Sequence, residues 1–100
     1  MARVSVLIPA HNAADSILSA IASAQAQTFT DIEIIVVDDA STDSTADLVH
    51  ERALSDTRIR LFRLEQNSGP AAARNVGLAH ATGEWIALLD ADDTFSDNRL

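Results

Sequence analysis

The sequence predicts an α/β fold in which a mostly parallel sheet carries helices on both faces. Four short apolar runs alternate with segments of helical period, and the second run is apolar almost throughout, as a strand covered on both faces should be. The chain also contains no internal repeat and no low-complexity tract. Alternation of strands and helices implies right-handed crossovers between parallel strands. We expect the four strands to lie in the order 3-2-1-4.

Local signals place each element along the chain. The expected strands cover residues 4–8, 32–37, 59–64 and 85–89, the first of them stopped by Pro9. Apolar residues at helical spacing predict a helix over 14–27, with Asn12 or Asp15 available to cap its start. Residues 41–45 are rich in capping side chains and open a second helix. Pro70 suits the first position of a third, which continues over 71–81.

Composition excludes several classes of protein. The formal net charge is −8, with 15 acidic residues against 7 Arg and no Lys, so a nucleic-acid backbone is not an expected partner. The absence of Cys excludes disulfide frameworks and thiolate metal sites, and it is compatible with a reducing cytoplasm. No apolar run reaches the length of a signal peptide or a membrane-spanning helix. We therefore expect a cytoplasmic protein, with membrane association of a longer parent protein left open.

Polar clusters follow three of the four predicted strands. They occupy residues 9–12, 38–39 and 90–93. In open parallel sheets, ligands bind at the carboxyl ends of the strands. The coincidence of three clusters with three such ends predicts a binding site at one edge of the sheet.

The last cluster, residues 90–93, places three carboxylates within four positions. Crowded carboxylates repel one another, and a hard cation such as Mg²⁺ or Mn²⁺ relieves that repulsion with oxygen ligands. In an extended segment the side chains of Asp90 and Asp92 point the same way, so both can face one ion. The alternative is an acidic turn in which Asp93 caps a helix that follows from Thr94 onward.

The other two clusters leave more than one interpretation open. One carboxylate of the pair Asp38 and Asp39 serves the turn or helix cap that follows, and the spare one can accept hydrogen bonds from a base or a ribose. His11 is more typical of a hydrogen-bonded loop residue than of a catalyst. Arg74 suits either an anionic ligand or a helix surface. The arginines of the third strand are interpreted as a solvated face; they are Arg58, Arg60 and Arg63.

Two nucleotide-binding motifs are missing. No glycine-rich fingerprint follows the first strand, which argues against a dinucleotide cofactor. A phosphate-binding loop of the Gly-Lys-Ser/Thr kind requires a Lys, and the chain has none.

In their order along the chain, four motifs resemble those of the family 2 glycosyltransferases, which have the GT-A fold. The motifs are VSVLIPAHN at 4–12, IIVVDDASTD at 34–43, NSGPAAARNVG at 67–77 and GEWIALLDADD at 83–93. The similarity covers nearly the whole chain, and four ordered motifs make it specific.

This resemblance implies a role for each matching position. Pro9 and Ala10 would line a nucleotide pocket through their backbone, and Asp39 would hydrogen-bond the base, usually uracil. Arg74 would support the base or the diphosphate. Asp90 would contact the ribose or the shell of a divalent metal, Mn²⁺ or Mg²⁺, and Asp92 would be its direct ligand.

The implied reaction is an inverting transfer from a nucleotide-diphosphate sugar to a carbohydrate or lipid-linked acceptor, in bacterial polysaccharide or exopolysaccharide synthesis. Residues 1–100 would be the nucleotide-sugar-binding portion. The acceptor-binding portion and the catalytic base are expected beyond Leu100. A sheet cut off there would also leave the fourth strand uncovered, which favours either pairing with another copy or a disordered C-terminus.

Two other classes compete with this interpretation. A phosphoacceptor signalling domain also combines a doubly wound sheet, paired Asp residues and Mg²⁺, but it uses a Lys that this chain lacks. A non-catalytic nucleotide-binding module of the same fold is the remaining alternative.

Overall fold

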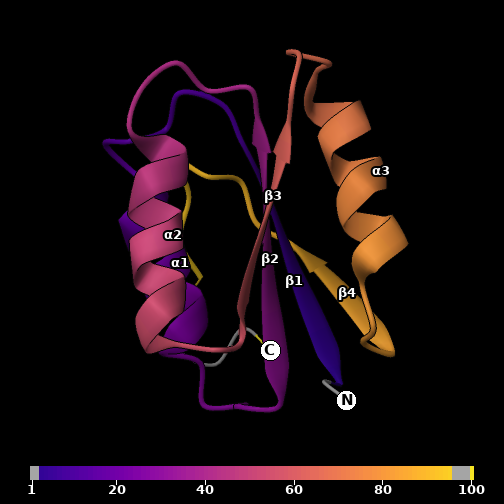
Figure 1. The fold of residues 1–100 in the computed structure, drawn as a ribbon. Helices are drawn as coiled ribbons and strands as arrows, with labels where there is room; N and C mark the ends of the chain where they lie inside the picture. The colour runs from indigo at the N-terminus through magenta and orange to yellow at the C-terminus, as the bar shows by residue number, and fades with distance from the viewer. Residues whose placement is uncertain (1–2, 96–99) are drawn as a thin grey trace.

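The computed structural model describes residues 3–95 and residue 100. Its strands are β1 (Val4–Ala10), β2 (Ile32–Asp39), β3 (Ile59–Leu64) and β4 (Trp85–Leu88), and its helices are α1 (Ile17–Gln25), α2 (Thr45–Ser55) and α3 (Pro70–His80). The strands pair in parallel in the order β3-β2-β1-β4, as predicted. Helices α1 and α2 cover one face of the sheet and α3 covers the other (Figure 1).

Several element boundaries differ by one to a few residues from the sequence-based prediction, and β2 in particular continues beyond residue 37 to Asp39. Pro9 does not end β1, which continues to Ala10. β4 pairs with β1 only as far as Leu7, whereas β2 pairs with β1 through Ala10. Pro9 therefore has a neighbouring strand on the β2 side alone, and a proline, which has no N–H to donate, is tolerated at such a position. Helix α1 begins at Ile17, and neither proposed residue caps it, since its cap position is Ser16. The side chain of Asn12 instead accepts a hydrogen bond from the backbone N–H of Thr42, at 2.8 Å.

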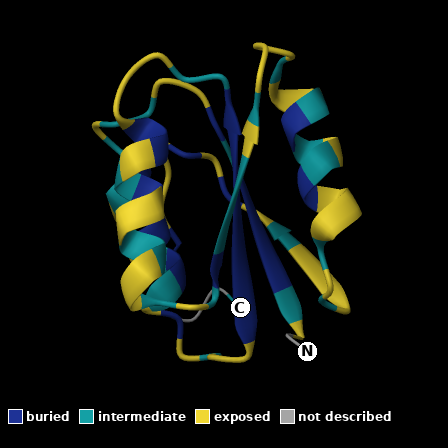
Figure 2. Cartoon of the chain, viewed as in Figure 1, coloured by how far each residue is buried: buried dark blue, intermediate teal, exposed yellow. Residues whose placement is uncertain are grey.

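The core lies on both sides of β2, in which every residue is buried (Figure 2). Even-numbered residues such as Ile34 and Val36 pack with α1 and α2, whereas Ile35 and Val37 pack under α3. Successive strand residues point to opposite faces. Asp38 therefore belongs to the α1/α2 face, and Asp39 belongs to the α3 face.

A buried polar cluster lies at the amino ends of the strands. Glu33 on β2 accepts hydrogen bonds from the hydroxyl of Ser5 (2.5 Å), the backbone N–H of Thr82 (2.6 Å) and the guanidinium of Arg60 (2.9 Å). The Ser5 hydroxyl oxygen accepts one from the backbone N–H of Gly83, at 2.8 Å. A Cβ at Gly83 would lie 2.6 Å from the backbone nitrogen of Ser5, so only glycine fits. The connection from α3 to β4 is thus attached to β1 and β2.

The arginines predicted to form a solvated face are partly exposed, Arg63 most of all, and each also has a carboxylate partner. Each guanidinium contacts a carboxylate: Arg58 contacts Asp56 at 2.9 Å, Arg60 contacts Glu33 at 2.9 Å, and Arg63 contacts Asp38 at 3.4 Å. Two of these carboxylates come from β2, so only the pairing of β2 with β3 reveals them as partners.

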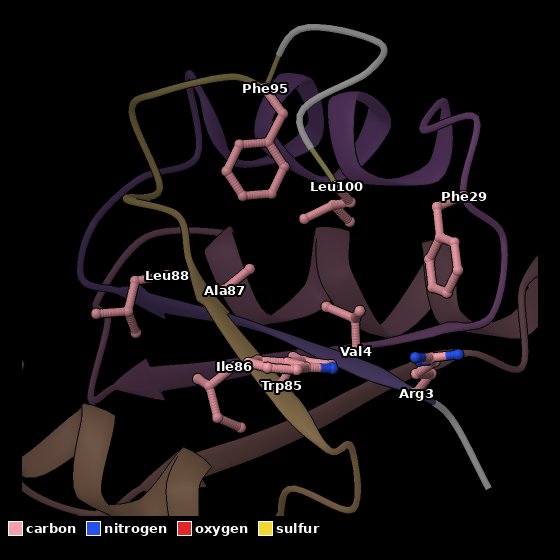
Figure 3. A pocket seen from close by; sticks show the side chains of 9 residues that line it. All are labelled: Arg3, Val4, Phe29, Trp85, Ile86, Ala87, Leu88, Phe95 and Leu100. Atoms are coloured by element: carbon pink, nitrogen blue, oxygen red, sulfur yellow. The ribbon is translucent and has the colours of Figure 1, made fainter.

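The outer edge of β4 is uncovered in the described part of the chain. Trp85 is 64% exposed and Leu88 is 54% exposed. Both line a hollow of about 830 Å³, together with Phe29, Phe95 and Leu100, and the side chains around it are drawn in Figure 3. The pairing of this edge with another copy stays a prediction. Among the described residues, no helix has the length and apolar character needed to cross a membrane.

The Glu33 cluster predicts a loss of stability in acid. Burial raises the pKa of Glu33, but the hydrogen bonds from Ser5, Thr82 and Arg60 outweigh it and hold that pKa at about 2 instead of 4.5. A lowered folded-state pKa contributes stability above pH 4.5 that is lost as the pH falls toward 2, here up to about 3 kcal/mol. Glu33→Gln should therefore lower the free energy of unfolding at pH 7 and flatten its dependence between pH 5 and pH 2.5, as measured by urea denaturation.

Glu51→Gln, at an exposed position of α2, is the matched control and should keep the wild-type pH dependence. The pKa of Asp56, which its hydrogen bonds with Arg58 depress, affects all three proteins alike. Parallel stability curves for Glu33→Gln and the wild type would contradict the assignment.

Candidate functional site

The sheet brings the three predicted polar clusters to its carboxyl edge. Two adjoining depressions lie there. The first, which we call the Asp39 cavity, has a volume of about 150 Å³ and is lined by Pro9, Ala10, His11, Asp39, Pro70 and Ala73. The second, the Asp92 hollow, has a volume of about 350 Å³ and lies between residues 90–92 and residues of the β1–α1 segment. Both include Pro9 and His11, so the two depressions are neighbours.

The Asp39 carboxylate holds the loop that precedes α3. One oxygen accepts the backbone N–H of Ser68 and the other accepts that of Gly69, each at 2.8 Å. Gly69 has φ 92°, a conformation that favours glycine, and it directly precedes α3. Each carboxylate oxygen retains a second acceptor site for a donor on a ligand. Sequence reasoning did not anticipate this structural role, because Ser68 lies 29 positions away.

His11 lies between the two depressions and is fixed by two hydrogen bonds. A carbonyl oxygen can only accept, so the contact of 2.7 Å between His11 Nδ1 and the carbonyl of Asp39 makes Nδ1 the donor. The amide of Asn67 then donates to Nε2 at 3.0 Å. The expectation of a hydrogen-bonded loop histidine is confirmed. Asn67 was not singled out, and its only sequence signal is its place at the start of the third motif.

The acidic motif is a turn, so the expectation of an extended segment is wrong. The backbone N–H of Asp93 donates to the carbonyl of Asp90 at 3.0 Å, and Asp93 also accepts the N–H of Thr94. The helix considered after Thr94 would fall largely outside the described residues. Asp90 and Asp92 are nevertheless both exposed and both line the Asp92 hollow, so the turn also presents them to one space.

The two carboxylates fit a divalent cation only as part of its shell. Among residues 3–95 and 100, no three side chains of His, Cys, Asp or Glu are grouped as metal ligands. An octahedral ion held by one or two carboxylates takes its other oxygens from water or from a phosphate. Asp90 and Asp92 therefore suit an ion that arrives with an anionic ligand.

Arg74 is the predicted site residue that the structure does not bring to either depression. It is half-buried, at the start of the second turn of α3, and neither the Asp39 cavity nor the Asp92 hollow includes it. Pro9 and Ala10 do line the Asp39 cavity, as expected.

Comparisons with known proteins agree with this geometry. The family described as Glycosyl transferase family 2 matches residues 5–100. The succinoglycan biosynthesis protein ExoO of Rhizobium meliloti (strain 1021) is 48% identical over 97 residues, covering 97% of this chain and 27% of that protein.

Two solved structures share the fold. S. aureus TarS 1–349 in complex with UDP-GlcNAc has a TM-score of 0.88 at 36% identity, covering 97% of this chain and 28% of that one. The mannosyltransferase PcManGT from Pyrobaculum calidifontis, in complex with GDP-Man and Mn²⁺, has a TM-score of 0.87 at 34% identity, covering 93% and 28%. The chain thus spans little more than a quarter of the length of these proteins.

Replacement of the Asp39 carboxylate should loosen the loop before α3. Each carboxylate oxygen of Asp39 accepts a backbone N–H, one from Ser68 and one from Gly69. In Asp39→Asn one of these oxygens becomes an NH₂ group, so in either orientation of the amide one backbone N–H faces a donor and loses its hydrogen bond. We expect a loss of about 1–3 kcal/mol in the free energy of unfolding, as is typical of a buried donor left unpaired. Amide hydrogen exchange should accelerate at Ser68 and Gly69. Asp92→Asn, at an exposed position, is the control; equal stability of the two variants would contradict the prediction.

Proposed function

Since the chain belongs to glycosyl transferase family 2, we propose that it forms the donor-binding part of an enzyme that transfers a sugar from a UDP-linked donor to an acceptor hydroxyl with inversion. The observation that carries the proposal is the junction of the Asp39 cavity with the Asp92 hollow at the carboxyl edge of the sheet. The Asp39 cavity combines apolar lining residues with one carboxylate, and the Asp92 hollow presents two exposed carboxylates.

The Asp39 cavity would receive the base. Pro9, Ala10, Pro70 and Ala73 supply its apolar lining, which suits the faces of a planar ring. Asp39 supplies acceptors, and the imide N–H of uracil is a donor that matches them. The carboxylate is already oriented by two backbone N–H groups, so it needs little reorganisation when the base binds.

The Asp92 hollow would receive the diphosphate together with Mn²⁺ or Mg²⁺. Asp92 would be the direct ligand of the ion, and Asp90 would contact the ribose or the metal's shell. An ion held there would supply Lewis-acid stabilisation of the negative charge that develops on the departing diphosphate. Asp90 and Asp92 orient the donor for attack, because the turn holds both side chains on the hollow that adjoins the base cavity. A supporting contact of Arg74 with the base or the diphosphate is also proposed, although Arg74 lines neither depression.

In the whole enzyme, the acceptor hydroxyl would attack the anomeric carbon in line, and a nucleoside diphosphate would leave. A base outside residues 1–100 would take the hydroxyl proton. The likeness to a succinoglycan biosynthesis protein supports a carbohydrate or lipid-linked acceptor and a role in bacterial polysaccharide synthesis. We propose a cytoplasmic location for the reaction; a lipid-linked acceptor would be met at the inner face of the membrane.

Calorimetric titration with UDP, with and without Mn²⁺, tests the proposal. Oxygens of the diphosphate would complete the coordination shell of the ion, so the bound ion should raise the affinity for UDP, and bound UDP the affinity for the ion, by the same factor of about 5- to 150-fold. Asp92→Asn should abolish the metal dependence. Asp39→Ala should weaken UDP binding by about tenfold or more in both conditions, because it removes the partner of the base and not of the ion.

GDP is the matched control ligand, because it carries the same diphosphate on a different base. It should bind more weakly than UDP, but with the same dependence on Mn²⁺. Equal binding of UDP with and without Mn²⁺, or an Asp92→Asn variant that behaves as wild type, would refute the role of the acidic turn. GDP binding as tight as UDP binding would refute base recognition by Asp39.

A further inference from the structure

Asp38 is a buried carboxylate that the proposed function does not use. It is 0% exposed and lies on the α1/α2 face of β2, opposite to Asp39. One of its oxygens accepts a hydrogen bond from the hydroxyl of Ser41. The other lies 3.4 Å from Nε of Arg63, and it accepts no hydrogen bond from any described residue. A buried carboxylate is costly unless its partners are fixed, so this arrangement requires an explanation.

The Ser41 hydroxyl links Asp38 to the loop after β1. Its single proton is donated to Asp38, and its oxygen accepts the backbone N–H of Asn12 at 2.9 Å. Ala40, between Asp39 and Ser41, has φ 55°, and Asn12 has φ 50°. Both values lie in the left-handed region, which Asn adopts more readily than Ala. The unfavourable conformation of Ala40 returns Ser41 to Asp38, and the hydrogen bond from Ser41 supports the left-handed conformation of Asn12.

Asn12 and its neighbour His11 line the proposed donor site. His11 belongs to both depressions and Asn12 to the Asp92 hollow. The amide oxygen of Asn12 is engaged with Thr42, and the next two backbone N–H groups of the segment donate to Thr45 and Asp43. The Ser41 contact is therefore the one that holds the backbone N–H of Asn12 itself. A change in the backbone at Asn12 would therefore move His11, which lines both the Asp39 cavity and the Asp92 hollow.

We propose that Asp38 is a positioning residue for the nucleotide: acting through Ser41, its carboxylate fixes the backbone of Asn12 and with it His11. This inference rests on the proposed function. A carboxylate suits the task because it can only accept, which commits the Ser41 proton to Asp38 and leaves the hydroxyl oxygen free for Asn12. Arg63 completes the arrangement. In Asp38→Asn the amide NH₂ avoids the guanidinium, turns to Ser41 and competes with the N–H of Asn12.

The test compares Ser41→Ala with Ser41→Thr, which keeps the hydroxyl, and with Ser55→Ala, which removes an exposed hydroxyl at the end of α2. The first readout is amide hydrogen exchange at Asn12 without nucleotide. The second is the affinity for UDP with Mn²⁺. Ser41→Ala should accelerate amide exchange at Asn12 about tenfold and weaken UDP binding about tenfold. A tenfold change corresponds to the upper end of what one hydrogen bond contributes.

Ser41→Thr and Ser55→Ala should stay within about twofold of wild type in both readouts. If Asp38→Asn folds, it should show the same changes in exchange and in UDP affinity as Ser41→Ala. If it does not fold, the two Ser41 variants alone test the proposed link. Unchanged exchange at Asn12 in Ser41→Ala overturns the link from Asp38. Faster exchange with unchanged UDP affinity overturns the positioning role and leaves Asp38 a purely structural group. Failure of the wild type to bind UDP overturns instead the proposed function, and the exchange readout still decides the link.

Discussion

Burial of β2 on both faces is the constraint on which the rest of this structure depends. The strand lies between β1 and β3, and all eight of its residues are buried. Three of them are nevertheless acidic: Glu33, Asp38 and Asp39. A carboxylate in such a place must be paired and hydrogen-bonded. Glu33 and Asp39 therefore engage segments that are distant in sequence, and Asp38 engages Arg63 of β3 together with Ser41 in the loop that follows β2.

The three carboxylates attach three different connections to the central strand. Glu33 holds the α3–β4 connection through Thr82, and Asp39 holds the loop before α3 through Ser68 and Gly69. Asp38 reaches the β1–α1 connection through Ser41. Two of these attachments lie at the carboxyl edge, where the proposed donor site is. The groups that hold the loops there thus also shape the candidate site, and the proposed contact of Asp39 with the base would couple binding to stability.

Small residues allow α3 to come close enough for this arrangement. A Cβ at Gly77 would meet Leu7 Cδ2 at 3.0 Å, and Ala73 is fully buried against the same face. A bulkier helix face would push α3 outward and separate Gly69 from Asp39. β4 contrasts with β2, since it is short, partly exposed and paired on one side only. Its main attachment to the rest of the fold is parallel pairing with β1, together with the Ser5–Gly83 contact at its start.

Local sequence patterns were enough to predict the elements, their order and the edge of the candidate site. Period-two and helical spacing are local properties, and parallel strands carry their carboxyl ends to the same edge, so the positions of Pro9, Asp39 and Asp92 at or just after the ends of their strands suffice to group them. The four ordered motifs also identified the family.

The partners of these groups, by contrast, follow from the packing of distant segments. Asp38 and Asp39 are adjacent in sequence, yet strand alternation sends them to different faces and to partners that lie in other loops or strands. The arginines of the third strand could not be matched to Glu33 and Asp38 without the register of β2 with β3. Likewise, the closed turn of the acidic motif depends on a backbone hydrogen bond that alternation does not predict. Residue patterns encode which face and which edge a side chain occupies, whereas the partner that satisfies a buried charge is set by contacts between distant segments.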